Sequence, residues 1–458
     1  MNKTLKRALA VGVGAMCTEV LRRAIFSKSR PRYEPWERPP YREFPNRVLI
    51  LGGGFAGYTA AKTLCKHTRH RDDVGVMLIS RENYFTFWPI LPGVVSSDID
   101  TKNVAQPLRR ALIRDGASFR RAEVRSIDLE QQCVTADGRE FPYEHLIVAL
   151  GGEPAYFGIP GVQEHAISMK GIGTAEEIRN RVIERYEETT LARGEVPDSK
   201  LTFVVIGGGA TGVETASELH QLVHEVLAPD FPNINPHRVR IILIDGNKEI
   251  LKELDPALRR TARKKLAALQ IEVINKVKAK EITAEKVVLD DGREIGTENP
   301  IWTAGARASE KLDDFNLPHD RRKGLEVDTY MRVKGHDNVW GIGDCAANVQ
   351  EDGSPVPPNA QAAVQEGRAV AKNVLAVIDG EELEPFEYRP LGQLVEMGSE
   401  FAVNEVFGIK FSGRMAALFW RVTYLYKLES PQSRARVAAD WFLELFYAPV
   451  VTEIRERK

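Results

Sequence analysis

The chain has 458 residues, 43% of them hydrophobic, and its formal net charge of −1 at pH 7 gives no electrostatic basis for binding nucleic acid. A single core stops growing beyond roughly 250–300 residues, so this length predicts two or three domains. The four cysteines show no CxxC or CxxxxC pairing, which argues against a redox-active disulfide or a zinc site and indicates a reducing compartment.

The first 45 residues differ in composition from the rest. Seven basic residues and one acid lie between Met1 and Arg30, around an apolar run from Ala8 to Cys17. That run is about half of the roughly 20 residues that a membrane-spanning helix needs. A basic amphipathic segment is predicted, either a targeting sequence, a surface anchor or a frayed tail, and a Pro-rich linker from Pro31 to Pro45 follows it.

Two glycine-rich loops lie 155 positions apart, from Leu51 to Gly57 and from Ile206 to Gly212. Each follows an apolar, β-branched run and opens a helical stretch. In such a loop the first glycine permits a tight turn, the second lets backbone N–H groups approach a pyrophosphate, and the third lets the helix pack on its strand. The pair of loops therefore predicts two dinucleotides bound at once.

The resemblance between the two units extends beyond the loops. Each has an Asp-Gly turn 85 or 86 residues after its first loop glycine, and a strand ending in glycine 13 residues further on. The turns are Asp137-Gly138 and Asp291-Gly292, and the closing glycines are Gly151 and Gly305. Asp-Gly after a β-rich run predicts a two-residue hairpin loop. Each unit is thus predicted to hold a βαβ start, an antiparallel meander and a returning strand.

The first unit is predicted over residues 46–161, the second over 162–323, and a third stretch over 324–380. The third stretch holds a short apolar strand that ends in Gly343-Asp344, then a Pro-rich loop and a helical run from Asn359 to Ile378. A carboxylate directly after a buried strand is often a turn residue or a helix cap. Because this one follows two nucleotide units, we favour a ligand-binding role.

Residues 381–458 are rich in aromatic and basic side chains. The aromatic residues lie in two stretches, Phe411–Leu428 (Phe419, Trp420, Tyr424, Tyr426) and Arg434–Val451 (Trp441, Phe442, Phe446, Tyr447). Neither stretch is free of charge for long enough to cross a membrane. Aromatic rings with basic residues at helical spacing suit a membrane interface, so we expect a peripheral membrane-association region. A dimer interface or a helical pair that caps the core is the alternative.

The loops, the run Ala360–Gly367 (Ala-Gln-Ala-Ala-Val-Gln-Glu-Gly) and the tail segments Trp420–Leu425 and Ser433–Val437 resemble type II NADH:quinone oxidoreductases. These are the single-chain, non-pumping respiratory NADH dehydrogenases, and the resemblance covers nearly everything from Arg47 to about Val451. It implies an α/β fold of the glutathione-reductase type, with two Rossmann-like dinucleotide-binding domains and a C-terminal helical membrane-associating segment. FAD would bind residues 46–161 and 324–380, and NADH would bind 162–323.

The resemblance also implies which residues contact the cofactors. The FAD contacts would be Gly52, Gly54, Phe55, Ala56, Gly57, Ser80, Arg81, Val124, Ala149, Gly151, Gly343, Asp344, Ala360 and Gln361. The NADH contacts would be Gly207, Gly209, Ala210, Thr211, Gly212, Glu214, Asp245, Ala304 and Gly305.

The ends of the second strands differ between the units. Asp245 ends the strand in the second unit, where a carboxylate accepts hydrogen bonds from an adenosine ribose and repels a 2′-phosphate, favouring NADH over NADPH. The nearby Arg240 and Lys248 weaken that preference. The first unit carries Ser80 at this place, which leaves open whether Arg81 or Glu82 orients the adenosine of FAD.

Three residues are predicted to be catalytic. Glu214 lies two residues past the third glycine of the second loop, where the helix macrodipole favours an acid. In related flavoproteins a glutamate here lies beside the flavin and nicotinamide rings, so a role in positioning or proton movement is predicted. Gln361 and Gln365 share one helix face, and the family motif places them at the quinone pocket; a polar helix surface is the alternative.

The predicted activity is hydride transfer from NADH to flavin, followed by transfer of two electrons to a membrane quinone without proton pumping. Three rivals remain open: a sulfide:quinone reductase, which needs paired reactive cysteines; a soluble NADH-dependent reductase with another acceptor; and a non-enzymatic NADH-sensing flavoprotein. We expect a peripheral membrane protein facing a reducing compartment, on the bacterial cytoplasmic side or in a mitochondrion. A homodimer is left open.

Overall fold

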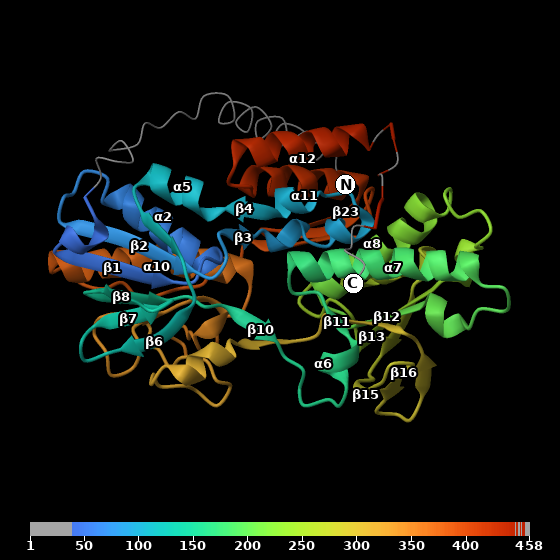
Figure 1. Cartoon of the computed structure of the whole chain (residues 1–458), viewed down its shortest axis with the longest axis horizontal. Coiled ribbons are helices and arrows are strands. Elements are labelled where there is room, and N and C mark those ends of the chain that lie inside the picture. Colours follow the sequence, from blue (N-terminus) through green and yellow to red (C-terminus); the bar gives the residue numbers. More distant parts are fainter. Residues whose placement is uncertain (1–38, 445, 448, 450, 454–458) are drawn as a thin grey trace.

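The computed structural model describes residues 39–444, 446–447, 449 and 451–453 (Figure 1). Most of the predicted N-terminal extension, residues 1–45, therefore lies outside the described residues. Its described end forms the short helical turn η1 (Tyr41–Glu43), and the Tyr41 hydroxyl donates to the Pro142 carbonyl at 3.1 Å. This contact fixes the start of the described chain against the first unit.

The first unit is built on a five-stranded parallel sheet with the order β20-β9-β1-β2-β5. Its strands are β1 (Asn46–Leu51), β2 (Val74–Ser80), β5 (Ser118–Arg121), β9 (His145–Val148) and β20 (Val339–Gly341). Because β1 lies between β2 and β9, the connections after β1 and β9 leave the sheet on different sides and open a crevice at the carboxyl ends. Strand β20 returns the stretch 324–380 to this sheet.

The second unit repeats the arrangement with the order β11-β18-β12-β13-β14. Its strands are β11 (Ile167–Ser168), β12 (Thr202–Ile206), β13 (Arg240–Asp245), β14 (Glu272–Asn275) and β18 (Asn299–Trp302). Strand β12 has the place of β1, so the second glycine-rich loop also starts at a crevice. A two-stranded ribbon of β10 (Gly152–Pro154) and β19 (Ala306–Ala308) joins the units.

Each unit also carries a three-stranded antiparallel meander, as predicted. The first consists of β6 (Val124–Asp128), β7 (Cys133–Ala136) and β8 (Arg139–Pro142), and the second of β15 (Ala279–Ile282), β16 (Lys286–Leu289) and β17 (Glu294–Gly296). The first Asp-Gly turn is a two-residue loop with positive φ at both residues. The second was predicted wrongly: Leu289 donates to the Arg293 carbonyl, so the loop has three residues and only Gly292 is left-handed.

Helices cover both sheets. The principal ones are α2 (Phe55–His67), α5 (Leu108–Asp115), α7 (Ile172–Leu191), α8 (Ala210–Gln221), α9 (Pro256–Ala268) and α10 (Ala360–Asp379). Short elements complete the units: β3 (Tyr84–Thr86), α3 (Gly93–Ser96), α4 (Thr101–Val104), β4 (Ala105–Pro107) and α6 (Val162–His165). Helices α2 and α10 pack along each other, which brings the glutamine run beside the first loop helix.

The C-terminal region contains a sheet that the sequence analysis did not predict. Strands β21 (Gly392–Glu396), β22 (Ala402–Val406) and β23 (Ile409–Gly413) form an antiparallel meander ahead of α11 (Arg414–Lys427) and α12 (Pro431–Leu443). Phe411 therefore lies in a strand, not in the predicted helical stretch. The two helices lie together at the top of Figure 1.

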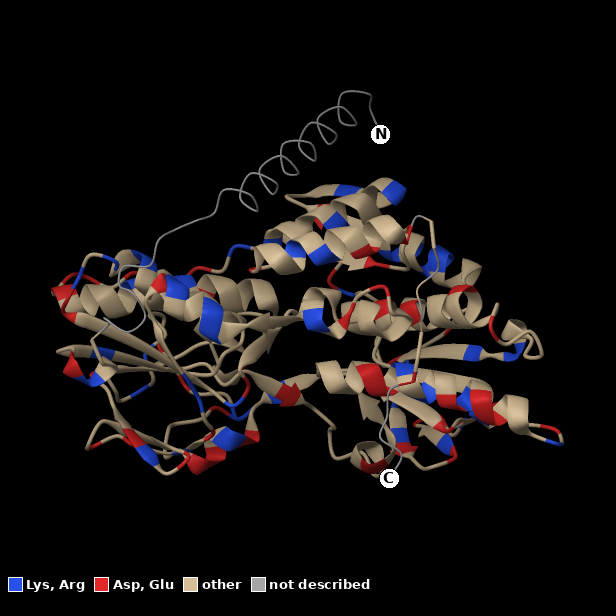
Figure 2. Ribbon diagram, turned by 45° about the horizontal axis from the view of Figure 1, so that its top comes forward, with Lys and Arg blue, Asp and Glu red and all other residues tan. Residues whose placement is uncertain are grey.

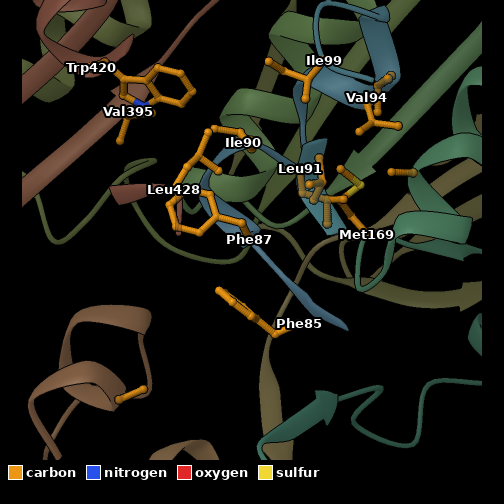
Figure 3. Close-up of a cluster of buried hydrophobic side chains, with 14 of the residues drawn as sticks. Phe85, Phe87, Ile90, Leu91, Val94, Ile99, Met169, Val395, Trp420 and Leu428 are labelled. Atoms are coloured by element: carbon orange, nitrogen blue, oxygen red, sulfur yellow. The ribbon is translucent and has the colours of Figure 1, made fainter. Parts of the chain in front are cut away.

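The aromatic residues of α11 and α12 divide into a buried set and an exposed set. Trp420 is 3% exposed and Trp441 is 9% exposed, so these two rings pack in the core instead of facing a membrane as predicted. Trp420 belongs to a buried apolar cluster with Val395 and Leu428 (Figure 3). Among the described residues of the C-terminal region, the large exposed apolar ones are Leu391, Phe407, Ile409, Met415, Leu418, Phe442, Leu443, Phe446 and Tyr447.

Within the described part of the chain, no helix has both the length and the apolar character needed to cross a membrane. Acidic and basic residues are interspersed over the ribbon of both units (Figure 2).

Candidate active site

The first glycine-rich loop has the backbone that a pyrophosphate site requires. Gly52 has a φ of 105°, and a side chain added there would lie 2.1 Å from the Ala149 carbonyl oxygen. Helix α2 starts after Gly54 without a side-chain cap, so its first N–H groups are available to an anion. The predicted FAD residues Gly52–Gly57, Ala149 and Gly151 therefore meet at the carboxyl ends of β1 and β9.

Asp344 faces the same crevice from the end of β20. It lies in the turn η7 (Gly343–Cys345), and its side chain is close enough to Gly152 that an added Cβ there would lie 3.3 Å from an Asp344 oxygen. Burial raises the pKa of this carboxyl. A half-buried carboxylate beside an uncapped helix start fits the hydroxyl-rich, pyrophosphate-linked part of FAD, because ribityl hydroxyls can donate to it.

Glu366 holds this turn and was missed by the sequence analysis. It is buried on α10, and its Oε2 accepts a hydrogen bond from the Gly343 N–H at 2.5 Å. Burial raises the pKa of Glu366 to about 7. The only available signal was an acid within the apolar run Ala360–Gly367, and nothing in the sequence connected it with Gly343.

The strand end of the first unit offers a hydroxyl in place of a carboxylate. Ser80 lies against Gly53, where an added Cβ would be 2.9 Å from the serine Oγ. The Arg81 side chain is 77% exposed and lies 3.5 Å from the Glu82 carboxylate. Val124 is buried at the start of β6. Arg81 and Glu82 form one exposed pair, so the structure does not favour either as the adenosine ligand.

The second loop repeats this geometry. Helix α8 starts after Gly209, again without a side-chain cap, and presents Ala210, Thr211 and Gly212 at its first turn. The Thr303 hydroxyl lies 3.0 Å from the carbonyl oxygens of Ile206 and Gly207 and ties the loop to the end of β18, where Ala304 and Gly305 follow. The predicted NADH residues therefore lie together.

Asp245 supports the second loop directly. Its Oδ2 accepts the Gly208 N–H and its Oδ1 accepts the Asn247 N–H, each at 2.5 Å, and the residue is 7% exposed. Each carboxylate oxygen keeps a further lone pair that a ribose hydroxyl could use. Asp245 therefore has a second role, in holding the glycine loop, beyond the cofactor preference predicted for it.

Glu214 is the fifth residue of α8, just past the first turn predicted for it, and points toward the C-terminal region. Its Oε1 accepts the Glu396 N–H at 3.4 Å, and burial raises the pKa of the Glu214 carboxyl well above its usual range. Burial, and then the charges of Glu214 and Glu396, raise the pKa of the Tyr424 hydroxyl. Burial therefore favours the protonated form of Glu214 more than it is favoured in a free glutamic acid.

A cavity of about 980 Å³ runs along α2, α10 and α11. Aromatic rings line it, and the lining includes residues predicted to contact FAD, namely Phe55, Ala360 and Gln361. The aromatic lining residues are Phe55, Tyr58, Phe85, Phe87, Tyr424 and Tyr426. The lining also carries charged side chains, among them Lys62, Arg368, Lys427 and Glu429, so the cavity offers both ring surfaces and polar groups to a planar ligand with polar substituents.

Gln361 and Gln365 line the cavity from one face of α10, as predicted, but their amides already bind backbone. Gln361 donates to the Gly392 carbonyl at 2.6 Å and accepts from the Leu391 N–H at 3.1 Å. Gln365 makes the same pair of bonds with the carbonyl and N–H of Arg389, at 2.9 and 3.0 Å. Both glutamines therefore anchor the segment ahead of β21, and each has one N–H left for a ligand.

Of the described cysteines, Cys133 and Cys345 are free thiols. Cys345 is buried, its thiol donates to the Ile342 carbonyl at 3.2 Å, and burial raises its pKa to about 12. Cys65 is buried within α2, and Cys133 lies on β7 of the first meander. A buried, protonated thiol is a poor nucleophile, so this site gives no support to sulfide chemistry.

Comparison with known proteins agrees with this geometry. The pyridine nucleotide-disulphide oxidoreductase family model matches residues 46–367, and the chain belongs to that family. The chain is 31% identical over 430 residues to the type II NADH:quinone oxidoreductase Ndh of Mycobacterium tuberculosis, covering 90% of each protein. It is 30% identical over 412 residues to a probable NADH dehydrogenase of Dictyostelium discoideum, covering 88% of this chain and 90% of the relative.

Within the family, the chain groups with the type II NADH:quinone oxidoreductases. Its fold is also that of NDH2 from Plasmodium falciparum, solved in complex with NADH, with a TM-score of 0.80 and 20% identity over 89% of this chain and 99% of that one. The resemblance stated from the sequence is confirmed, and so is the fold of two dinucleotide-binding domains.

Proposed function

We propose that this chain is a FAD-dependent oxidoreductase that takes a hydride from NADH and passes two electrons to a membrane quinone without proton pumping. The observation that carries the proposal is the aromatic cavity, whose lining includes Ala360, Gln361 and Phe55, the residue that follows Gly54 of the first glycine-rich loop. A quinone ring in that cavity would lie next to the FAD site while NADH occupied the second loop. Family membership supports both cofactors.

A bound flavin supplies the two-electron chemistry that links NADH to the acceptor. The first loop would bind its pyrophosphate through the uncapped start of α2, and Asp344 would accept hydrogen bonds from its ribityl chain. The second loop would orient NADH through the start of α8 and Asp245. Glu214 would hold a proton between these sites, and the free N–H of Gln361 would donate to a quinone carbonyl.

NADH oxidation measured with and without added quinone tests the proposal. We expect quinone-dependent NADH consumption by purified protein, a bound FAD spectrum, and a preference for NADH over NADPH. Oxidation that does not depend on quinone would favour the soluble-reductase alternative, and FAD bleaching by NADH without turnover would favour the sensor.

The glutamines give a sharper test now that their contacts are known. Replacing Gln361 and Gln365 with leucine removes the free N–H groups and also releases the segment 389–392. We expect quinone-dependent turnover to fall by about tenfold or more, since a lost hydrogen bond of about 1–1.5 kcal/mol changes a rate by close to that factor. Gln365→Leu alone is the control, because it leaves Gln361 and its bonds to residues 391 and 392 in place. If flavin reduction by NADH slows as much as quinone-dependent turnover does, the two glutamines only anchor the segment 389–392.

We further propose peripheral membrane association through the exposed apolar end of the C-terminal helices. Phe442 is 60% exposed and Phe446 is 66% exposed, and both rings lie where α12 ends. Exposed aromatic rings are typical of proteins that insert shallowly into a bilayer. The side of the membrane stays a prediction, with the bacterial cytoplasmic face first and a mitochondrial face second.

Deleting the chain from Phe411 would not test this attachment, because it removes β23 and the buried Trp420. Phe442→Ser with Phe446→Ser leaves the core intact and should release the protein from vesicles. Leu191→Ser, at an exposed residue of the second unit, is the control. If the double variant stays on vesicles, other residues attach the protein to the membrane. If only its oligomeric mass changes, the two rings belong to a homodimer interface.

A further inference from the structure

The aromatic cavity along α2, α10 and α11 carries much more positive than negative charge. The whole chain has a formal net charge of −1, but among the described residues eight lysines and arginines line this cavity against two acids. The basic residues are Lys62, Lys66, Arg69, Arg114, Arg368, Lys372, Lys427 and Arg434, and the acids are Asp115 and Glu429. The cavity is therefore strongly basic within a chain that is nearly neutral.

Both acids of the lining already have a basic partner. Glu429 accepts a hydrogen bond from Lys62 Nζ, and Asp115 accepts one from Arg114 Nε at 3.2 Å. In the part of the chain that the structure describes, three further cations of the lining form no ion pair with an acid: Lys66, Arg368 and Lys427. These cations fit an anion that the described chain does not supply.

Helices α2 and α10 run side by side in the same direction. Gly367 packs against the backbone of Ala56, where an added Cβ would lie 2.4 Å from the carbonyl oxygen, and Arg71 pairs with Asp379 at 2.7 Å where the two helices end. The starts of the two helices therefore lie together, and so do their ends.

Along both helices the lining is neutral at first and becomes basic later. On α2 the order is Phe55, Tyr58, Thr59, Lys62, Thr63 and Lys66, and on α10 it is Ala360, Gln361, Val364, Gln365, Arg368 and Lys372. Seven helical residues, the separation of Phe55 from Lys62 and of Gln361 from Arg368, span about 10 Å. The positive charge thus begins about 10 Å from the predicted flavin contacts.

The cations and the aromatic rings of the lining also contact each other. Lys62 Nζ lies 5.6 Å from the centre of the Tyr58 ring, and Lys427 Nζ lies 5.4 Å from the centre of the Tyr424 ring. Tyr58 is buried, whereas Lys427 and Arg368 are exposed. A ligand that packs a ring on the buried aromatic part would therefore have its other end beside exposed ammonium and guanidinium groups.

We propose that this cavity selects amphiphilic quinones that carry an anionic group, such as a carboxylate, on a short chain, with the ring on the aromatic lining and the anion at Arg368 and Lys427. A cleft lined by one sign of charge concentrates counter-ions and speeds their association. The inference rests on the proposed function and names the acceptor class for the same cavity. NADH, one solvent proton and the quinone carboxylate give NAD⁺ and the quinol carboxylate. The hydride carries both electrons, and the carboxylate is unchanged.

A charge series of acceptors tests the proposal on the wild-type, FAD-loaded chain. Three quinones share one ring and one alkyl chain and end in a carboxylate, a hydroxyl or a trimethylammonium group. We expect kcat/KM for the carboxylate to exceed that for the hydroxyl by about fivefold, which corresponds to about 1 kcal/mol, and the ammonium compound to be the poorest. Added salt should shrink the difference, because exposed cations are screened. Equal values for all three acceptors would contradict the proposal.

The double variant Arg368→Gln with Lys427→Gln assigns the preference to these two residues. Arg263→Gln with Lys264→Gln is the matched control, since it removes two exposed cations from α9 of the second unit, outside the cavity. Only the first pair should bring the carboxylate-to-hydroxyl ratio of kcat/KM close to one. A similar drop in the control would mean that overall charge, and not this cavity, sets the preference.

A redox-inactive probe supplies a readout that is independent of turnover. Pyrenebutanoate and pyrenebutanol share a planar ring and differ in charge, and their fluorescence reports binding to the oxidised protein without NADH. We expect the carboxylate to bind about fivefold more tightly, and the Arg368 and Lys427 double variant to lose this difference. An active wild type that shows neither preference would overturn the inference alone. A wild type that prefers the carboxylate probe but reduces no quinone would overturn the proposed function and leave the anion site in place.

Discussion

The two glycine-rich loops share one backbone but differ in what supports them. In the second unit, Asp245 at the end of β13 accepts the N–H of the middle glycine, Gly208. In the first unit, Ser80 at the end of β2 lies beside the middle glycine, Gly53, with a hydroxyl. The strand end therefore determines both how each loop is anchored and what an adenosine ribose meets. Similar loops need not bind their dinucleotides in the same way.

The largest effect should come from a side chain at the first glycine of each loop. Gly52→Ala would force a Cβ to within 2.1 Å of the Ala149 carbonyl at a φ of 105°. We expect FAD to be lost and stability to fall by at least about 1–3 kcal/mol, the cost of such backbone strain. Gly207→Ala, at a φ of 121°, should instead keep FAD and raise the KM for NADH. Flavin content and NADH titration separate the two, and FAD loss from both variants would show that the loops do not act independently.

Asp344→Ala should have the next largest effect. Removing this carboxyl leaves ribityl hydroxyls without an acceptor, so flavin should dissociate about tenfold or more faster. Asp344→Asn keeps the shape and one acceptor oxygen, and it should lose less. Equilibrium dialysis measures both; full FAD occupancy in Asp344→Ala would mean that the flavin is bound elsewhere in the crevice.

Exchanging the strand-end residues should have a moderate effect. Asp245→Ser should narrow the preference for NADH over NADPH by several-fold, because it removes the charge that repels a 2′-phosphate. It should also loosen the second loop, so Asp245→Asn serves as the control that keeps one acceptor oxygen. The reciprocal Ser80→Asp should leave this preference unchanged. A wild type that uses NADPH equally well would contradict the role of Asp245.

The smallest effect should be on how protein stability changes with pH, through Glu366, which binds the turn that carries Asp344. Burial raises the pKa of Glu366 to about 7, above its value in an unfolded chain. The folded protein therefore binds more protons, and its stability should fall as pH rises from about 4.5 through 7. Glu366→Gln should flatten this fall in Tm while keeping an acceptor for the Gly343 N–H. A slope identical to that of wild type would assign the dependence to other groups.

The repeat made most of the fold predictable. Glycine spacing, β-branched runs and Asp-Gly turns are local signals, and they predicted both loops, the meanders and the strand ends at Ser80 and Asp245. The C-terminal sheet was missed because β21 and β22 are short and only half buried, so their alternation is weak. Trp420 was assigned to a membrane interface because composition alone does not show which helix face packs inward.

The side-chain contacts of the site were less predictable than its backbone. Gln361 and Gln365 were correctly placed on one helix face, but their bonds to residues 389–392 depend on where a separate segment passes. The role of Glu366 could not be predicted, because its partner Gly343 lies 23 residues away along the chain. Long-range pairing of this kind follows from the fold and not from local pattern.

Anaerobic titration of the purified protein with NADH, followed by addition of quinone, tests the central claim most directly. The account predicts one FAD per chain whose absorbance bleaches with one equivalent of NADH and returns fully when quinone is added. Protein without flavin, or flavin that NADH reduces but quinone leaves reduced, would contradict it.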